Sequence, residues 1–527
     1  MAAAAPGLRA GGGQSVVRPD AVRVAGAFRL DDVSLADLGA LMASGRATSL
    51  SLTRQYLARI EEIDRRGPRL NSIIEVNPDA AGIAAALDRE RRASGPRGPL
   101  HGIPILLKDN LDTHDRMTTT AGSLALAGSV APRDSFVAGR LRAAGAVLLG
   151  KTNLSEWANY RGSGSSSGWS GRGGLTRNPY VLDRNPSGSS SGSAVAVAAG
   201  LCAAAVGTET DGSIVSPSSF NGIVGLKPTV GLVSRSGIIP ISRSQDTAGP
   251  MTRTVTDAAI LLGVLAGVDP LDPATAGAEG KSGAGYTSWL RPGAMAGARL
   301  GIARSCFGFH PRVDELMRQA LESMQGLGAE FRDPVEVPQG PAFEGAEGTV
   351  LSYEFKDGIN AYLAALGPAA PVRDLAGLIE FNRRHADREL RWFGQDLFLK
   401  AQARGPLTDP AYLEALATCR RLARSEGLDA TMDRHGLDAI IVPTTGPAHV
   451  TDLVLGDHDI GGGTSPAAVA GYPHITVPLG RIDGLPVGIS FFGRAWSEGR
   501  LLALAFAFEQ ATLVRRAPAF LPTVWPA

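Results

Sequence analysis

The chain has 527 residues, and its 52 Lys and Arg residues almost balance its 51 Asp and Glu residues, for a formal net charge of +1. This balance excludes a strongly basic surface for nucleic acid or anionic membranes and indicates a neutral or small substrate. No apolar run is long enough to cross a bilayer, and residues 1–27 lack the apolar core of a signal peptide. We therefore expect a cytoplasmic protein whose residues 1–27 form a disordered tail.

The first third of the chain alternates between helical and strand patterns. Ser34 and Asp37 form a weak capping box at the start of the first helix. We expect helices at 34–44, 49–64, 79–94 and 134–144, and strands at 72–76, 103–107 and 146–149.

The central stretch is built from small residues. A Gly/Ser run at 187–193 is expected to be too flexible for regular structure. A helical segment at 194–201, an apolar run at 203–206 and a polar loop at 207–213 follow, with another turn or helix start near Pro217. Such loops let backbone N–H groups and hydroxyls approach a substrate closely.

The rest of the chain returns to strand–helix alternation after a Pro/Gly-rich surface segment or linker at 269–293. Residues 341–435 are expected to be mostly helical and to form an insertion or a lid. Helices are expected at 254–267, 312–327 and 497–511, and strands at 299–304, 328–333, 438–442, 473–478 and 486–492. This pattern predicts an α/β fold, with a large mixed sheet covered by helices on both faces.

Several common catalytic patterns are missing. The eight histidines show no HExxH spacing, and the cysteines, Cys202, Cys306 and Cys419, form no metal-spaced pair, so we expect no metal and no disulfide dependence. There is no phosphate-binding glycine motif, and no cofactor is expected. Gly188–Gly192 matches G-x-S-x-G, but any Gly/Ser-rich loop produces that match.

A lysine-based site is better supported than a Ser–His–Asp site, because no histidine can be paired with an acid from spacing alone. Only six of the 52 basic residues are lysine. Lys108 stands at the end of the apolar run 103–107, and ligands gather at such strand ends in α/β sheets. A lysine screened from water can take a serine proton. A surface lysine at the start of a loop is the alternative reading.

An ordered set of motifs resembles the amidase signature family across roughly residues 30 to 515. The motifs are Gly102-Ile103-Pro104 with Lys108-Asp109-Asn110, GKTNLSEW at 150–157, SGSSSGS at 187–193, GTETDGSI at 207–214, GLKPT at 225–229, DTAGPM at 246–251, SPAAVAGYPHITVP at 465–478 and GLPVGISFFG at 484–493. We expect one domain over 28–520, with its signature core at about 100–260.

The resemblance implies a Ser–cis-Ser–Lys triad that needs no cofactor. Lys108 matches the family's base, Ser189 the bridging serine after a cis peptide bond, and Ser213 the nucleophile that forms an acyl-enzyme. Ser190 matches a supporting hydroxyl. The N–H groups matching the oxyanion hole are those of Thr210, Asp211, Gly212 and Ser213.

Departures from the common family loop narrow the expected substrate. Glu209 replaces an Asp, Asp211 a Gly and Val215 an Arg, which argues against the subunit of the aminoacyl-tRNA amidotransferase, as does the lack of basic excess. These segments instead resemble bacterial peptide amidases, which convert a peptide's C-terminal amide into a free acid and ammonia. By resemblance, Asn159 is a candidate substrate contact, and loop capping is its equal alternative. Lys151 and Lys227 are expected to be structural.

Other readings remain open. One is a broad acylamidase or aryl-amide hydrolase with the same triad and a different pocket. Another is a non-catalytic scaffold or a subunit on an amidase fold, against which the intact Lys108, Ser189 and Ser213 speak. We expect a small-molecule or short peptide amide substrate, no nucleic-acid or membrane partner, and a monomer or homodimer.

Overall fold

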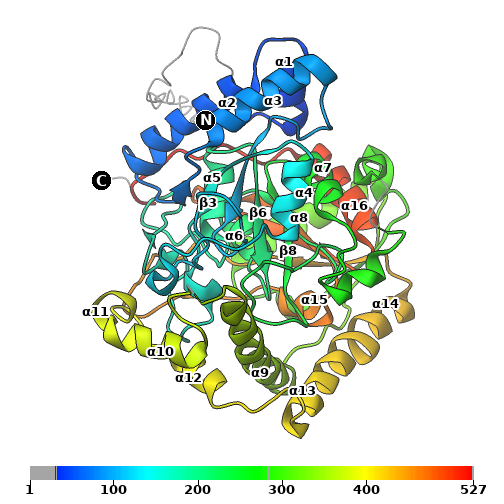
Figure 1. Ribbon diagram of the computed structural model, residues 1–527. Coiled ribbons are helices and arrows are strands. Elements are labelled where there is room, and N and C mark those ends of the chain that lie inside the picture. Colours follow the sequence, from blue (N-terminus) through cyan, green and yellow to red (C-terminus); the bar gives the residue numbers. More distant parts are fainter. Residues whose placement is uncertain (1–29, 31, 282–284, 369, 525–527) are drawn as a thin grey trace, which may run out of the picture.

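A mixed sheet of eleven strands forms the centre of the molecule (Figure 1). The computed structural model describes residue 30 and residues 32–281, 285–368 and 370–524; the predicted tail at 1–27 lies outside this part. The strands are β1 (Ile73–Val76), β2 (Pro104–Lys108), β3 (Val147–Thr152), β6 (Ala204–Glu209), β7 (Val224–Lys227), β8 (Thr247–Thr252), β9 (Arg299–Ile302), β10 (Glu330–Arg332), β11 (Ala439–Pro443), β12 (His474–Ile482) and β13 (Leu485–Phe492).

The sheet order is β1-β3-β2-β6-β8-β7-β12-β13-β11-β9-β10, so the two halves of the chain meet where β7 pairs with β12. β2 runs parallel to both β3 and β6, and β9 runs parallel to both β10 and β11, while the other pairs are antiparallel. All residues of β2, β3 and β6 are buried, as is typical of strands with helices on both faces. The predicted α/β mixed sheet is confirmed. A separate small hairpin pairs β4 (Trp169–Ser170) with β5 (Gly174–Leu175).

The helices pack around this sheet and gather at two ends of the molecule. In Figure 1, α1–α3 lie together at the top, and α9–α13 lie at the bottom. The helices are α1 (Leu35–Ala43), α2 (Ser49–Arg59), α3 (Ala80–Ser94), α4 (Phe136–Ala143), α5 (Ser191–Ala198), α6 (Val215–Phe220), α7 (Val255–Leu265), α8 (Pro311–Gly326), α9 (Pro341–Ala365), α10 (Leu375–Arg384), α11 (Ala386–Glu389), α12 (Asp396–Gln402), α13 (Pro410–Arg420), α14 (Asp429–His435), α15 (Ser465–Ala470) and α16 (Glu498–Thr512).

Several local predictions are confirmed and others are wrong. The Ser34–Asp37 capping box is present. The composition of the Gly/Ser run at 187–193 predicts no regular structure. This is wrong for its last residues, because α5 begins at Ser191. Small side chains allow tight packing there; a Cβ on Gly192 would collide with backbone atoms of Asn153 and Ser72. The polar loop predicted at 207–213 is also shorter, since β6 continues to Glu209.

Further elements depart from the expected pattern. The helix expected at 49–64 ends at Arg59 and continues as a π turn, and the segment at 269–293 contains three short 3₁₀ turns. β7, β8 and α15 carry no strong local signal, and the sequence pattern does not predict them. Within the described residues, none of the helices is both long and apolar enough to cross a bilayer.

Candidate active site

Lys108 lies at the carboxyl end of β2, beside the end of the parallel strand β6. Its Nζ donates hydrogen bonds to Ser189 Oγ at 2.8 Å, Ser190 Oγ at 3.0 Å and Thr208 Oγ1 at 2.9 Å, and lies 3.2 Å from the Thr208 carbonyl oxygen. Parallel strands end at the same edge of a sheet, which brings Lys108 to the β6 end although 100 residues separate it from Thr208.

The amine of Lys108 is fully buried. Burial penalises its charged form and lowers its pKa to about 7, while the carboxylates of Glu209 and Asp246 act in the opposite direction. A substantial fraction of Lys108 is therefore neutral near pH 7 and able to accept a proton.

Ser189 and Ser190 are held at the start of α5 by a tight backbone turn. The Gly188–Ser189 peptide bond is cis, as the resemblance implies. A Cβ on Gly188 would collide with Ser155 Oγ, so any other residue here would displace Ser155. The N–H of Ser190 donates to the Ser213 carbonyl oxygen at 3.2 Å, which joins this turn to the loop of the predicted nucleophile.

The loop 210–213 follows β6 directly and is held from both sides. Thr210 Oγ1 donates to Asp246 at 2.6 Å, and the carboxylate of Asp211 accepts a hydrogen bond from Thr464 at 2.7 Å. Gly212 has a φ of +73°, a conformation that glycine adopts without strain.

The backbone N–H groups of Asp211, Gly212 and Ser213 donate no hydrogen bond to any described residue. Since buried N–H groups are normally paired, these three donors are available to a substrate oxygen. The structure thus brings together Lys108, the predicted bridging serine Ser189, the predicted supporting serine Ser190 and the donor loop.

Ser213 opens onto a cavity of about 900 Å³. Asn159 also lines it, but its amide is engaged with neighbouring serines: its Nδ2 donates to Ser167 Oγ at 3.0 Å, and its Oδ1 accepts from Ser165 Oγ at 3.1 Å. Both readings of Asn159, as a substrate contact and as a loop-capping residue, remain compatible with this position.

Sequence reasoning missed the far wall of this cavity. It contains Phe307 and Phe309, which follow β9, together with Phe343 and Glu344 from the first turn of α9. Gln245 connects α9 to the donor loop, because its Nε2 donates to Glu347 at 2.8 Å and lies 3.3 Å from the Thr210 carbonyl oxygen. No local pattern indicates that a helix so much later in the chain borders the site.

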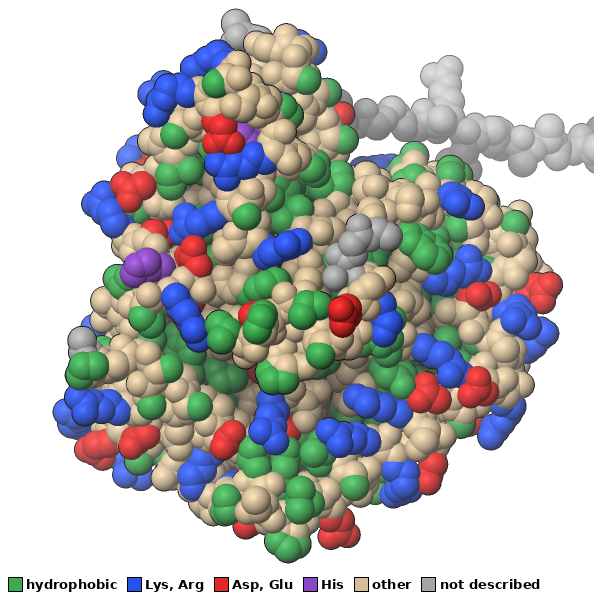
Figure 2. Space-filling view, turned by 45° about the vertical axis from the view of Figure 1, so that its right-hand side comes forward, with side chains coloured by type: hydrophobic (Ala, Val, Ile, Leu, Met, Phe, Trp, Pro, Cys, Tyr) green, Lys and Arg blue, Asp and Glu red, His purple; other side chains and the backbone are tan. Residues whose placement is uncertain are grey.

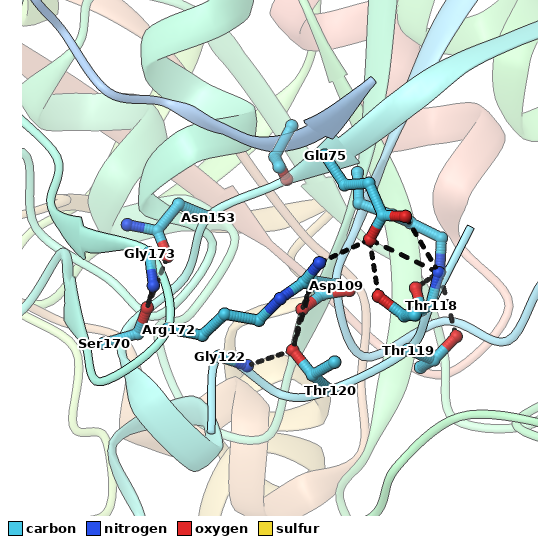
Figure 3. A network of polar contacts seen from close by, with 12 residues as sticks. Glu75, Asp109, Thr118, Thr119, Thr120, Gly122, Asn153, Ser170, Arg172 and Gly173 are labelled. Atoms are coloured by element: carbon cyan, nitrogen blue, oxygen red, sulfur yellow. Dashed lines mark hydrogen bonds and ion pairs between the residues drawn. The ribbon is translucent and has the colours of Figure 1, made fainter. Parts of the chain in front are cut away.

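A polar network behind the site anchors the residue after Lys108 (Figure 3). Arg172, in the Gly-rich loop after β4, pairs with Glu75 at 2.5 Å and with the buried carboxylate of Asp109 at 3.4 Å. Thr120 also donates to Asp109. The sequence predicts neither the Arg172–Asp109 pair nor its role in placing the end of β2.

The other buried lysines have structural partners. Lys151 Nζ donates to the carbonyl oxygens of Leu111 at 2.7 Å and Thr118 at 3.0 Å, and to Thr119 Oγ1 at 2.9 Å. Lys227 Nζ donates to the Pro228 carbonyl oxygen at 3.3 Å. In the described residues, no cluster of three His, Cys, Asp or Glu side chains is arranged to hold a metal ion.

Comparison with known proteins places the chain in a family. The family model described as Amidase matches residues 51–502. The structure is similar to the native peptide amidase of Stenotrophomonas maltophilia, with 53% identity, a TM-score of 0.88 and coverage of 92% of this chain and 98% of that one.

Two further proteins agree with this match. A probable amidase of Arabidopsis thaliana is 42% identical over 96% of this chain and 95% of its own length. The crystal structure of an amidase family protein from Bacillus anthracis is 34% identical, with a TM-score of 0.84 and coverage of 92% of both chains. The chain belongs to the amidase family and is an amide-hydrolysing enzyme.

Proposed function

We propose that this enzyme hydrolyses the C-terminal amide of short peptides, using Lys108, Ser189 and Ser213 as a triad. The observation that carries the proposal is the buried hydrogen bond of 2.8 Å between Lys108 Nζ and Ser189 Oγ, next to a loop with free N–H donors that ends at Ser213. The cavity of about 900 Å³ is large enough for a dipeptide amide, and the similarity to peptide amidase supports the peptide substrate.

In the first half of the reaction, neutral Lys108 takes a proton from Ser189 while Ser189 takes one from Ser213. Ser213 Oγ attacks the amide carbon, and the resulting oxyanion accepts hydrogen bonds from N–H groups of Thr210, Asp211, Gly212 and Ser213. One such donor typically contributes about 3 kcal/mol to transition-state stabilisation. The proton returns to the amide nitrogen, the C–N bond breaks, and ammonia leaves an acyl-enzyme.

In the second half, water attacks the acyl-enzyme and passes a proton back through the same serine and lysine. The ester bond to Ser213 breaks, which restores the nucleophile and releases the peptide acid. Ser190 supports this path, because its hydroxyl accepts from Lys108 and donates to the Thr208 carbonyl oxygen at 2.9 Å.

The test is ammonia release from an N-acetylated dipeptide amide, compared with a simple aliphatic amide and an anilide. We expect fast release from the peptide amide and a loss of at least about 10³-fold in Ser213→Ala and Lys108→Ala. Ser216→Ala, which removes another cavity-lining hydroxyl, is the matched control and should retain activity.

Each other outcome assigns a different function. Hydrolysis of only the anilide or aliphatic amide would contradict the peptide substrate and favour an acylamidase. Inactivity of the purified chain on all three would favour a subunit or scaffold role. The same preparation, analysed by sedimentation, tests the expected monomer or homodimer, and limited proteolysis tests the single domain proposed for 28–520.

A further inference from the structure

The walls of the catalytic cavity carry charge of one sign. Within the described part of the chain, its lining includes carboxylates but no Lys, Arg or His; the carboxylates are Asp211, Glu344, Asp457 and Asp459. The outer surface differs, because Figure 2 shows basic and acidic side chains interspersed over the face that it presents. The acidic lining is therefore a local property of this cavity.

One of the four carboxylates has an evident structural role. Asp457 accepts hydrogen bonds from the N–H of Ser167 at 3.0 Å and from Asn185 Nδ2 at 2.9 Å, and it lies 3.5 Å from His449 Nε2. These contacts hold the loop after β11 against the Gly/Ser loops. They give the carboxylate of Asp457 a structural role and satisfy most of its charge.

The other three carboxylates form no ion pair with any described residue. Asp211 accepts a neutral hydrogen bond from Thr464, while the exposed side chains of Glu344 and Asp459 line the cavity. Carboxylates without an ion-pair partner that line one cleft with low-dielectric sides concentrate a negative potential in it.

Neighbouring carboxyl groups respond to this potential. Burial and the charge of Asp211 raise the pKa of Glu347, one turn after Glu344, to about 8. Partial desolvation by the cavity walls and the charge of Asp457 likewise raise the pKa of Asp459, while the nearby His449 acts in the opposite direction. In both groups desolvation is the larger cause, and a neighbouring carboxylate adds to it.

These carboxylates do not define a site by themselves, since they share their cavity with Ser213. A substrate whose carbonyl carbon reaches Ser213 enters the cavity that Glu344 and Asp459 also line. Hydrolysis then turns a neutral amide and water into a carboxylate and an ammonium ion, so the peptide product acquires a charge of the same sign as the walls.

We propose that Glu344 and Asp459 make the cavity charge-selective, favouring peptide amides that carry a cationic group near the scissile amide and disfavouring peptides with a free C-terminal carboxylate. This inference rests on the proposed peptide amidase function. The cation is an α-ammonium group or a Lys or Arg side chain. The same field accelerates release of the acid product and weakens its inhibition.

The experiment uses the full chain and three blocked substrates, acetyl-Lys-Phe-amide, acetyl-Gln-Phe-amide and acetyl-Glu-Phe-amide, which differ in charge at similar size. We expect kcat/KM to fall in that order, with about three- to tenfold between the Lys and Gln substrates at low ionic strength. Added salt should narrow the difference, because it screens the charges.

The double variant Glu344→Gln/Asp459→Asn should bring the three kcat/KM values within about twofold of one another, whatever its overall rate. Inhibition by acetyl-Gln-Phe, the free acid, should strengthen by a similar factor. Glu380→Gln, on the exposed surface of α10, is the matched control and should retain the wild-type order.

Equal rates for the three substrates in the wild type would overturn the inference and leave the amidase function intact. The same conclusion follows if the double variant keeps the full charge preference and the weak product inhibition. Failure to release ammonia from even the neutral Gln substrate would instead overturn the proposed function on which the inference rests.

Discussion

The carboxylate of Glu209 accepts a hydrogen bond from the N–H of Ile214 at 2.7 Å, directly after the predicted nucleophile. The same oxygen accepts from the N–H of Val215 at 3.0 Å. Glu209 thereby fixes the turn that carries Ser213 and satisfies two donors at the start of α6.

Glu209 also acts on Lys108 through its charge, since it is the strongest nearby influence that favours the protonated amine. In Glu209→Gln, the acidic limb of the pH profile of kcat/KM should therefore move to lower pH by up to about one unit. The isosteric amide can still accept the two backbone hydrogen bonds. An acidic limb that stays in place would contradict a charged Glu209 beside Lys108.

The wild-type pH profile should report the neutral form of Lys108. Below a pKa of about 7 the amine is protonated and cannot accept the proton from Ser189, so kcat/KM should rise tenfold per pH unit and level off above that value. The measurement uses a blocked, uncharged dipeptide amide, so that substrate titration makes no contribution. A flat profile between pH 5 and 9 would exclude Lys108 as the base.

Gly212→Ala tests the geometry of the donor loop. A Cβ at this position would lie 2.9 Å from Ser216 Oγ, in a backbone conformation that costs non-glycine residues about 1–2 kcal/mol. We expect kcat/KM to fall about 100-fold, because displaced N–H groups no longer donate well-aligned hydrogen bonds to the oxyanion that develops in the transition state.

Gly45→Ala is the matched control for this change. Gly45 has the same φ of +73°, but nothing lies within 4 Å of its added Cβ, and it follows α1 far from the cavity. Both variants should lose a similar free energy of unfolding, measured with urea, while only Gly212→Ala loses activity. Equal activity in the two would show that the 210–213 loop does not position the reacting oxygen.

Arg172→Gln tests the network drawn in Figure 3. The change leaves the fully buried Asp109 without its arginine partner, which should lower the free energy of unfolding by about 2 kcal/mol and reduce kcat by displacing the end of β2. The control is Arg116→Gln at an exposed pair with Asp79, where we expect less than about 1 kcal/mol and unchanged kcat. Comparable losses in both variants would contradict an anchoring role for Arg172.

The local sequence pattern is sufficient to predict the helices and strands that contain a clear apolar run. The buried run at 103–107 places Lys108 at a strand end, and parallel pairing of β2 with β6 then explains its contact with Thr208. β7 and β8 escape prediction because β7 has only four residues and both strands are interrupted by Gly or Pro. Their pairing with β12 and β6 is decided by contacts distant in sequence.

The residues of the site likewise fall into those that the sequence predicts and those that it does not. Its lysine, serines and donor loop sit in motifs that a resemblance can identify, whereas Arg172 and Glu344 join it only through tertiary packing. The first turn of α9, which contains Glu344, lines the cavity, and Gln245 links the next turn at Glu347 to the Thr210 carbonyl oxygen. This contact between α9 and the donor loop depends on the whole fold and on no single segment.

β7 pairs with β12 in the middle of the sheet, and the stretches of chain before and after this junction contribute different parts of the site. Residues proposed to break and form bonds all precede position 214, while Phe307, Phe309, Glu344 and Asp459 come after position 300. Substitutions at these later positions would therefore reshape part of the cavity wall and leave Lys108, Ser189 and Ser213 in place.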